Sequence, residues 1–452
     1  MRRALCNGSA RHCSERVTDE RIAPARHVDA EVVVPGDKSI SHRALIIGAL
    51  ANGRSYAGNV SPAEDVAATA RCLRACGAWV RDFGRGRVAL EGSGPGRSLR
   101  TPLEPLHCGN SGSTMRLLAG AIAGHESTAT LIGDASLQRR PMERVAAPLR
   151  TMGAEVRISA DGTPPMTVSG RSALRAVDWR SPVASAQVKS AILFAALSGD
   201  GRTVVRQPHP TRDHTERLLR MCGIDVGADG DGTVSLNPGN VEPFGMRVPG
   251  DISAAAFYLC LVAARPGWRV RTERVGLNPG RTGVLEVLQQ MGAAVAVTQR
   301  HSDGPEPEGD VEVSGVDLGA MVIDGGLTVR CIDELPVIAV LATQADGETH
   351  IRDAAELRTK ESDRIAVVAN GLRSFGAACE TTTDGLVVSG PTTLSAARVS
   401  SYGDHRLAMA WAVAAALCDV HSGVSIIERA DAAAVSYPSF FDDFQRVVSE
   451  SD

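Results

Sequence analysis

Lysine is almost absent from this chain of 452 residues, because only Lys38, Lys189 and Lys360 among its 48 lysines and arginines are lysines. Arginine is used almost wherever a generic surface cation would serve. A lysine that persists against this bias is expected where a compact, rotatable and titratable ammonium is needed and a planar guanidinium will not serve. The three lysines therefore mark three places to look for chemistry.

Aromatic residues and net positive charge are also scarce. Phe, Trp and Tyr make up 4% of the sequence, and the formal net charge at pH 7 is −4. Proteins that bind nucleic acids rely on stacking aromatic side chains and on a basic surface, so no nucleic-acid partner is expected. Cationic clusters in this chain should be local and should bind small anions.

Paired cysteines and long apolar runs are missing as well. The ten cysteines are scattered singly, without a Cys-x-x-Cys pair, which excludes the usual zinc spacings and favours a reducing cytoplasm. No apolar run reaches the ~18 residues of a membrane span, and no phosphate-binding or dinucleotide fingerprint is present. We therefore expect a cytoplasmic protein with no metal, no cofactor and no membrane partner.

A short unit repeats along the chain: a helix-like segment ends in glycine and is followed by a pair of strand-like segments. Each glycine fits the position just after a helix, which needs a left-handed backbone. The five repeated glycines are Gly77, Gly153, Gly223, Gly292 and Gly376.

A longer repeat lies over the short one. Val34-Pro35-Gly36-Asp37 recurs 214 residues later as Val248-Pro249-Gly250-Asp251, and an apolar helix-like run follows each copy. This spacing corresponds to about three short units. The sequence therefore predicts an α/β fold of two similar domains, with the two Val-Pro-Gly-Asp segments at the crossovers between them and a ligand cleft between the domains.

The domain boundaries follow from the crossovers. We expect residues 27–34 and 250–452 to form one discontinuous domain, and residues 35–249 the other. Residues 1–26 are polar and arginine-rich, and are expected to be a disordered extension or to result from a start codon placed too early. A sixth unit should be truncated near the C-terminus. The polar stretch 298–309 should be a flexible excursion, and we assign it no function.

The stretch 34–43 combines several anion-binding features. It runs from a β-branched segment through a Pro-Gly turn into an apolar helix, whose first N–H groups are free to hold an anion. Lys38, Ser39 and Arg43 add a point charge, a hydroxyl and a planar fork. The competing interpretation is a capped helix start with solvated charges.

Seven further segments place glycine, serine or charged residues beside a predicted helix start. Taken singly, each is also consistent with a helix cap or a solvated surface. The cations of these segments come from both halves of the chain. If these cations converge on one cleft, the cleft would suit two small, multiply charged anions. Asp333 and Glu361 stand among them as candidate proton carriers. The cations are Lys38, Arg43, Arg140, Arg212, Lys360, Arg364 and Arg406.

The geometry around the third lysine depends on local structure. If Lys360 and Arg364 lie one helical turn apart, they share a face and Glu361 points away from it.

These motifs together, in this order, resemble the 5-enolpyruvylshikimate-3-phosphate synthase family (3-phosphoshikimate 1-carboxyvinyltransferases). The resemblance covers nearly the whole chain beyond residue 34. It implies the enolpyruvyl transferase fold, an inverse α/β barrel in which each of two domains contains three βαβαββ-like units. The segments that carry it are residues 35–43, 109–116, 139–142, 184–190, 211–216, 332–336, 360–364 and 404–406.

The resemblance also implies a reaction. The enolpyruvyl group of phosphoenolpyruvate passes to the 5-hydroxyl of shikimate 3-phosphate, with release of phosphate, by addition and elimination through a tetrahedral intermediate. This reaction belongs to aromatic amino acid (chorismate) biosynthesis. The implied partners are these two small molecules, and the implied state is a monomer.

Site roles carry over motif by motif. Asp333 matches the proton acceptor, Glu361 the residue that protonates and later deprotonates the methylene carbon, and Lys38 a catalytic residue that touches both substrates. The residues that match shikimate 3-phosphate contacts are Lys38, Ser39, Arg43, Ser185, Ala186, Gln187, Thr211, Arg212, Asp333 and Lys360. Those that match phosphoenolpyruvate contacts are Lys38, Gly112, Arg140, Gln187, Arg364 and Arg406.

Two positions bear on variation within the family. Val435 stands where some members carry a lysine, which implies one cation fewer at the phosphoenolpyruvate end. Gly112 matches the position at which glyphosate competes with phosphoenolpyruvate in the family, where a bulkier residue gives tolerance.

Two alternatives stay open from the sequence. The first is the sister enolpyruvyl transferase that acts on UDP-N-acetylglucosamine, which carries a Lys-Asn pair in place of Lys38-Ser39 and a loop cysteine as acid. Cys108 is the cysteine nearest such a loop, and we interpret it as structural. The second is a catalytically inactive binding module, against which the intact Lys38, Asp333, Glu361 and Arg406 argue.

Overall fold

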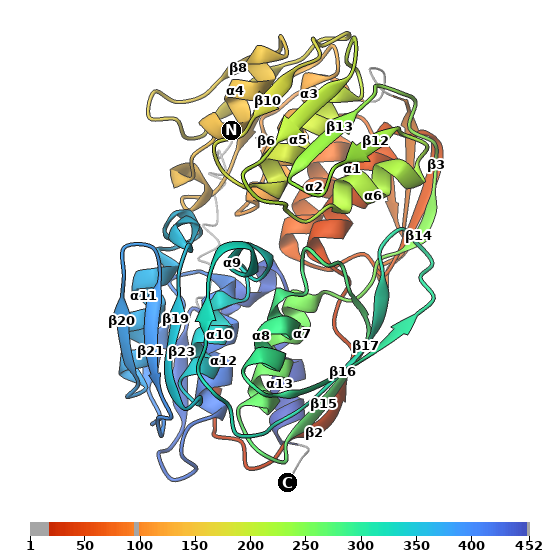
Figure 1. Cartoon of the computed structure of the whole chain (residues 1–452). Helices are drawn as coiled ribbons and strands as arrows, with labels where there is room; N and C mark the ends of the chain where they lie inside the picture. The colour runs from red at the N-terminus through yellow and green to blue at the C-terminus, as the bar shows by residue number, and fades with distance from the viewer. Residues whose placement is uncertain (1–17, 95–98, 450–452) are drawn as a thin grey trace, which may run out of the picture.

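The computed structural model describes residues 18–94 and 99–449. Figure 1 shows two halves stacked one above the other, with chain segments passing between them on one side. The upper half contains α1 (Lys38–Leu50), α2 (Glu64–Ala75), α3 (Gly112–Ala123), α4 (Glu143–Thr151), α5 (Ala186–Ala196) and α6 (His214–Met221). The lower half contains α7 (Ile252–Ala263), α8 (Gly283–Gln290), α9 (Gly325–Arg330), α10 (Leu335–Ala342), α11 (Arg364–Ser374), α12 (His405–Ala416) and α13 (Phe440–Ser449).

Small mixed sheets form the outside of both halves, and in each complete sheet two parallel strands are followed by two antiparallel ones. In the upper half the order is β14 (Gly245–Arg247), β3 (Asn52–Gly58), β5 (Val88–Ser93) and β4 (Trp79–Asp82). The second sheet consists of β6 (Leu106–His107), β7 (Thr128–Ile132), β9 (Met166–Ser169) and β8 (Glu155–Arg157). The third consists of β10 (Asp178–Arg180), β11 (Thr203–Arg206), β13 (Thr233–Leu236) and β12 (Val226–Ala228).

The lower half repeats this plan. Its first sheet consists of β2 (Asp29–Val32), β15 (Arg269–Gly276), β17 (Glu308–Ser314) and β16 (Ala294–Arg300). The second consists of β18 (Val322–Ile323), β19 (Gly347–Ile351), β21 (Leu386–Gly390) and β20 (Ala378–Thr381). The third has β22 (Arg398–Ser400), β23 (Ser425–Glu428) and β1 (Glu20–Ile22).

Three helices fill the centre of each half. Helices α1, α3 and α5 above, and α7, α10 and α12 below, are apolar and buried almost all round, as expected of helices enclosed by sheets. Apolar side chains form two separate cores, one from residues 40–248 and the other from residues 22–34 together with 252–447. We propose the expected domain boundaries, 35–249 and 27–34 with 250–452, on the basis of these cores.

The repeated glycines occupy the position that the pattern predicts. Each follows the residue that caps the C-terminus of α2, α4, α6, α8 or α11, and each has a left-handed backbone with φ between 79° and 104°. A side chain is strained in this conformation, so glycine ends these helices and turns the chain into the following strand. The glycines are Gly77, Gly153, Gly223, Gly292 and Gly376.

The two Val-Pro-Gly-Asp segments lie side by side as antiparallel partners. Gly36 pairs with Gly250, the Asp37 N–H donates to the Pro249 carbonyl at 2.8 Å, and the Asp251 N–H donates to the Pro35 carbonyl at 2.8 Å. A Cβ on Gly36 would lie 1.7 Å from the carbonyl oxygen of Asn59, so only glycine fits there. The two crossovers therefore form one tightly packed junction between the halves.

Two expectations about irregular segments are wrong. Residues 1–17 lie outside the described residues, but within the expected disordered extension Glu20–Ile22 form β1, which pairs antiparallel with β23 from Glu20–Ile427 to Ile22–Ser425. The truncated sixth unit is thus completed by the start of the chain. The excursion 298–309 is also ordered, since it includes parts of β16 and β17 and holds Glu306, which is 1% exposed.

Glu306 anchors this excursion to the upper half. Its Oε1 lies 2.8 Å from His214 Nδ1 at the start of α6, and its Oε2 accepts from Asn278 Nδ2 at 2.8 Å. A buried carboxylate needs such partners, and a polar stretch read alone does not reveal them. In the described part of the chain, no helix is both long enough and apolar enough to cross a membrane.

Candidate active site

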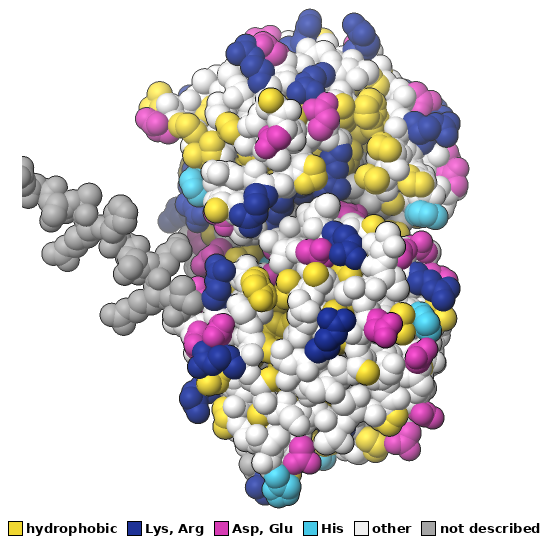
Figure 2. All heavy atoms as spheres, turned by 90° about the vertical axis from the view of Figure 1, so that its left-hand side faces the viewer, with side chains coloured by type: hydrophobic (Ala, Val, Ile, Leu, Met, Phe, Trp, Pro, Cys, Tyr) yellow, Lys and Arg dark blue, Asp and Glu magenta, His cyan; other side chains and the backbone are white. Residues whose placement is uncertain are grey.

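A cavity of about 620 Å³ lies between the two halves. Figure 2 shows a narrow waist between the two halves, with lysine and arginine side chains above and below it. Every site residue expected from the sequence lines this cavity. These residues are Lys38, Ser39, Arg43, Gly112, Arg140, Ser185, Ala186, Gln187, Thr211, Arg212, Asp333, Lys360, Glu361, Arg364 and Arg406.

The six central helices direct their N-terminal ends at this cavity. Its lining includes residues from the first turn or the cap of α1, α3, α5, α7 and α12, and Asp333 just before α10. Side chains of five residues cap these helices by accepting a backbone N–H. The caps are Asp37, Ser111, Ser185, Asp251 and Asp404. The partial positive charges of helix N-termini from both halves thus favour anions in the cavity.

Lys38 begins α1 at the junction of the two crossovers. Its backbone N–H donates to Asp251 Oδ2 at 3.2 Å, and its ammonium lies 3.0 Å from Asp65 Oδ2. Burial raises the pKa of Asp65, and the ammonium of Lys38 opposes that rise. Asp65 was missed from the sequence, because an acid in the first turn of a helix reads as a stabilising charge on the helix dipole.

Arg43 is held rigidly one helical turn further on. Its guanidinium donates to Thr215 Oγ1 at 2.7 Å, to the Ser39 carbonyl at 2.9 Å and to Ser190 Oγ at 2.9 Å. Burial lowers the pKa of Arg43 to about 10, so the group remains a cation at neutral pH. Such a fixed fork is suited to an anionic or hydroxylated ligand.

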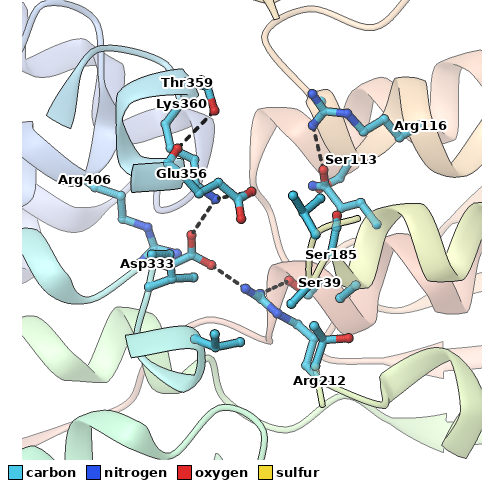
Figure 3. Close-up of a pocket in the computed structure, with 18 of the residues that line it drawn as sticks. Ser39, Ser113, Arg116, Ser185, Arg212, Asp333, Glu356, Thr359, Lys360 and Arg406 are labelled. Carbon is cyan, nitrogen blue, oxygen red and sulfur yellow. Dashed lines mark hydrogen bonds and ion pairs between the residues drawn. The ribbon is translucent and has the colours of Figure 1, made fainter. Parts of the chain in front are cut away.

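Asp333 is surrounded by cations from both halves. Its Oδ2 accepts from Arg212 at 2.8 Å, and its Oδ1 lies 3.8 Å from the Lys360 ammonium. Figure 3 shows Arg212 reaching from the opposite side of the cavity to this carboxylate. Burial alone would raise the pKa of Asp333, but Arg212, Lys360 and Arg406 outweigh burial and hold it well below its usual value.

Glu361 bridges the halves at the other end of the cavity. Its carboxylate lies 3.1 Å from Arg140 Nη1 and 2.7 Å from Arg364 Nη2. Burial raises its pKa, but Arg140, Arg364 and the other surrounding cationic groups outweigh burial and hold the pKa well below the usual value. Both Asp333 and Glu361 are therefore carboxylates at neutral pH.

The condition on which the expectation for Lys360 and Arg364 depended is not met. Lys360 follows the short 3-10 helix Ala355–Thr359, whereas Arg364 is the first residue of α11, so the two do not share a helix. Glu361 does not point away from Arg364 but contacts it directly. The helical spacing rule fails because the chain turns between residues 360 and 363.

Arg140 and Gly112 form the part of the site nearest α3. Arg140 is 6% exposed and donates to Asn110 Oδ1 at 2.5 Å, whereas the neighbouring Arg139 is exposed. A Cβ on Gly112 would lie 2.9 Å from Arg116 Nη1 and 3.1 Å from Arg140 Nη1. The missing side chain at Gly112 therefore leaves room for these guanidinium groups and for a ligand between them.

Arg281 is not singled out from the sequence, and Asp404 is named only as part of the 404–406 motif, without a role. Arg281, which is 3% exposed, lies 3.5 Å from Asp333 and 3.3 Å from Asp251. Asp404 accepts from Arg364 Nε at 2.8 Å and thereby fixes that guanidinium. The one signal for Arg281 is its place after Pro279-Gly280, a polar turn before a helix, as at the other motifs.

Cys108 and Val435 lie away from the cavity lining in the described residues. The hydrogen bond with Cys72 and burial raise the pKa of the Cys108 thiol well above its usual value, so this group stays protonated. Because Cys108 is buried and lies outside the cavity lining, it is not placed to protonate a ligand in the cavity. Among residues 18–94 and 99–449, no group of three or more His, Cys, Asp and Glu side chains is arranged to hold a metal ion.

The arrangement defines an enolpyruvyl transferase fold: two halves of repeated units, sheets outside, and a cation-lined cavity between six helix N-termini. An EPSP synthase from Acinetobacter baumannii has the same fold, with a TM-score of 0.83 and 39% identity over 95% of this chain and 98% of that chain. The enolpyruvyl transferase NikO from Streptomyces tendae shares the fold at 17% identity, with a TM-score of 0.75 over 94% and 96% of the chains.

Sequence comparison specifies the family. The family described as EPSP synthase (3-phosphoshikimate 1-carboxyvinyltransferase) matches residues 22–444. The 3-phosphoshikimate 1-carboxyvinyltransferase of Synechococcus sp. (strain WH7803) is 49% identical over 92% of this chain and 95% of its own length. That of Geobacillus kaustophilus (strain HTA426) is 47% identical over 92% and 97%.

This chain belongs to the EPSP synthase family. This confirms the expected fold. It also confirms that the protein is a 3-phosphoshikimate 1-carboxyvinyltransferase of aromatic amino acid biosynthesis. The alternatives of a UDP-N-acetylglucosamine enolpyruvyl transferase and of an inactive binding module are not supported.

Proposed function

We propose that the cavity joins phosphoenolpyruvate to the 5-hydroxyl of shikimate 3-phosphate and releases phosphate. The observation that carries this proposal is the convergence of cations from both halves on the carboxylates Asp333 and Glu361. The two substrates together carry two phosphates and two carboxylates, which match the cations and the helix N-termini around the cavity. Family membership supports the same pair of substrates.

The shikimate 3-phosphate end is assigned to the side of the cavity that contains α1, α5 and the start of α6. Arg43 and Arg212 would bind the phosphate and carboxylate, and Asp333 and Lys360 would face the ring hydroxyls. The residues assigned here are Lys38, Ser39, Arg43, Ser185, Ala186, Gln187, Thr211, Arg212, Asp333 and Lys360.

The phosphoenolpyruvate end is assigned to the guanidinium groups around Glu361. Arg140 and Arg364 both contact that carboxylate, so a phosphate or carboxylate bound between them would lie against it. Lys38 and Gln187 lie between the two ends and serve both substrates. The residues assigned here are Lys38, Gly112, Arg140, Gln187, Arg364 and Arg406.

The reaction needs one base and one group that both donates and removes a proton. Asp333 takes the proton of the 5-hydroxyl as its oxygen attacks C2 of phosphoenolpyruvate, and Glu361 gives a proton to the C3 methylene. The C–O bond to phosphate then breaks while Glu361 takes a proton back from C3. Lys38 and the arginines stabilise the charge on the tetrahedral intermediate and on the leaving phosphate.

An assay for inorganic phosphate tests this assignment directly. Phosphate release should require both shikimate 3-phosphate and phosphoenolpyruvate and should stop when either is omitted. Release with UDP-N-acetylglucosamine in place of shikimate 3-phosphate, or binding of both substrates without release, would contradict it.

Glu361 is expected to take up a proton when phosphoenolpyruvate binds in the presence of shikimate 3-phosphate. Arg140 and Arg364 lower its pKa, and a bound anion would offset these cations and raise the pKa. Titration calorimetry in buffers of different ionisation enthalpy, at about pH 8 where phosphate monoesters are fully ionised, measures this uptake. Proton uptake should increase as the pH is lowered from about 8, because a larger fraction of Glu361 is then protonated in the complex, where its pKa is raised.

The Glu361→Gln variant is the control for this measurement. It keeps the shape of the side chain but has no titrating group, so the buffer dependence should disappear. An undiminished dependence in the variant would assign the proton to another group.

Replacing Gly112 by alanine is expected to raise the KM for phosphoenolpyruvate about tenfold and to weaken competitive inhibition by glyphosate more strongly. The added methyl group would lie 2.9 Å from Arg116 and 3.1 Å from Arg140, so one or both guanidinium groups must move. A displacement of about 1 Å at a substrate-positioning group can cost up to 100-fold. Steady-state inhibition kinetics measure both effects, and an unchanged KM for shikimate 3-phosphate is the internal control.

We further propose that the enzyme acts as a monomer in the cytoplasm. The described cysteines are free and buried, which suits a reducing compartment. Light scattering coupled to size-exclusion chromatography tests the monomeric state.

A further inference from the structure

Lys189 is the one lysine of the three to which the reaction assigns no role. It belongs to α5, and its side chain is 3% exposed. Its ammonium lies 2.6 Å from Glu216 Oε1 on α6, and it donates to the backbone carbonyls of Thr211 at 3.3 Å and of Arg212 at 3.2 Å. The side chain therefore connects α5 both to residues 211 and 212, which lead into α6, and to Glu216 on α6 itself.

The ammonium group combines two kinds of contact. It donates hydrogen bonds to two backbone carbonyls and forms an ion pair with the buried carboxylate of Glu216. A guanidinium is planar and wider and carries five donors, so it would need a different arrangement of acceptors. A compact ammonium suits these contacts, which is consistent with a lysine at this position in a chain that otherwise uses arginine.

The two carbonyls belong to residues of the proposed shikimate 3-phosphate end. The Arg212 side chain extends across the cavity to Asp333 Oδ2 at 2.8 Å, and its Nη1 lies 3.4 Å from Ser39 Oγ. Thr211 donates through its hydroxyl to Gln207 Oε1 at 2.8 Å. The Lys189 ammonium thus holds the backbone from which the Arg212 side chain extends toward the opposite half.

We propose that Lys189 is a positioning residue for shikimate 3-phosphate: by binding the Thr211 and Arg212 carbonyls, it sets the direction of the Arg212 guanidinium. Lys189 lies behind the cavity lining and acts through Arg212, without touching substrate. This inference rests on the proposed function, in which Arg212 binds shikimate 3-phosphate. Glu216 supplies the counter-charge that allows an ammonium to remain buried.

The Lys189→Met variant tests the inference. Its KM for shikimate 3-phosphate should rise about ten- to a hundredfold, as for other misplaced positioning groups, while the KM for phosphoenolpyruvate should change less than about threefold. A general loss of folded protein would instead lower kcat in proportion to the amount of active enzyme and leave both KM values unchanged. Equal KM values in the variant and the parent would overturn the inference.

A matched set of variants separates positioning from charge burial. Lys189→Met leaves Glu216 buried without a partner, and the double variant Lys189→Met/Glu216→Gln removes that charge and should regain thermal stability. If the carbonyl contacts are what matters, the raised KM for shikimate 3-phosphate persists in the double variant. Recovery of the parental KM would show that only the unpaired charge was harmful and would overturn the inference.

Two further variants complete the test. Glu216→Gln keeps the lysine and its carbonyl contacts, so it should lower stability while raising the KM for shikimate 3-phosphate much less than Lys189→Met does; an equal rise would contradict the inference. Arg212→Ala should raise this KM at least as much as Lys189→Met. An unchanged KM in Arg212→Ala would reject the proposed role of Arg212 and the inference with it, whereas a raised KM there with no effect of Lys189→Met would reject the inference alone.

Discussion

Replacing Lys38 by methionine is expected to lower kcat/KM by about 10³-fold or more. Lys38 is the residue that we place in contact with both substrates, where the two crossovers meet at the start of α1. Loss of one group that stabilises charge in the transition state typically costs 10²- to 10³-fold. Lys38 would contribute to binding both anions as well, so its removal should cost more than a single such contact.

The same substitution removes the ion pair between Lys38 and Asp65, whose side chains are 3.0 Å apart. Burial raises the pKa of Asp65, and without the ammonium this rise is opposed less strongly. The double variant Lys38→Met/Asp65→Asn, which leaves no unpaired charge, should therefore recover stability but remain inactive. Arg54→Met, which removes an exposed cation paired with Glu91 on the outer sheet, should retain full activity.

Phosphate release measured over a range of concentrations of each substrate gives kcat/KM for these variants. Activity within tenfold of the parent in Lys38→Met would refute the central role of this lysine.

Replacing Asp333 by asparagine is expected to lower kcat by about 10³-fold without raising the KM for either substrate. A positioned general base contributes about 10²- to 10⁴-fold. Asparagine keeps the shape and can still accept the hydrogen bond from Arg212, so the geometry is retained while the base is lost. Since Asp333 also offsets Arg212, Lys360 and Arg281, its neutralisation leaves a more positive cavity, which should bind the anionic substrates as tightly or more tightly.

The separation of kcat from KM distinguishes this result from misfolding or loss of binding. Binding of shikimate 3-phosphate, measured by calorimetry, should be retained in Asp333→Asn. A raised dissociation constant with unchanged kcat would instead make Asp333 a binding residue and would leave the base to be sought elsewhere.

Local backbone chemistry explains why much of the fold could be predicted. The five repeated glycines are visible in the sequence because each helix end needs a left-handed residue whatever surrounds it. The rarity of lysine similarly pointed to Lys38 and Lys360, which line the cavity, and to Lys189, which supports it from behind.

Contacts between distant segments explain what could not be predicted. Arg281 becomes a partner of Asp251 and Asp333 only when the crossovers pack against each other. The residues near Arg281 in the sequence therefore do not indicate these two partners. Glu361 contacts Arg140 from the other half of the molecule. It also contacts Arg364, because residues 360–363 form a turn and not the helix that the spacing allows. Such positions are fixed by tertiary packing rather than by local propensity.

The pairing of β1 with β23 sets an order for assembly during synthesis. Strand β2 pairs with β15 and β1 with β23, so these early segments wait until residues 269–276 and then 425–428 have left the ribosome. Residues 40–248 can meanwhile bury their own apolar core, since none of its members comes from outside that range. The upper half should therefore fold first, before residues 18–32 have strands to pair with. The sheet that contains β1 and β23 should form last.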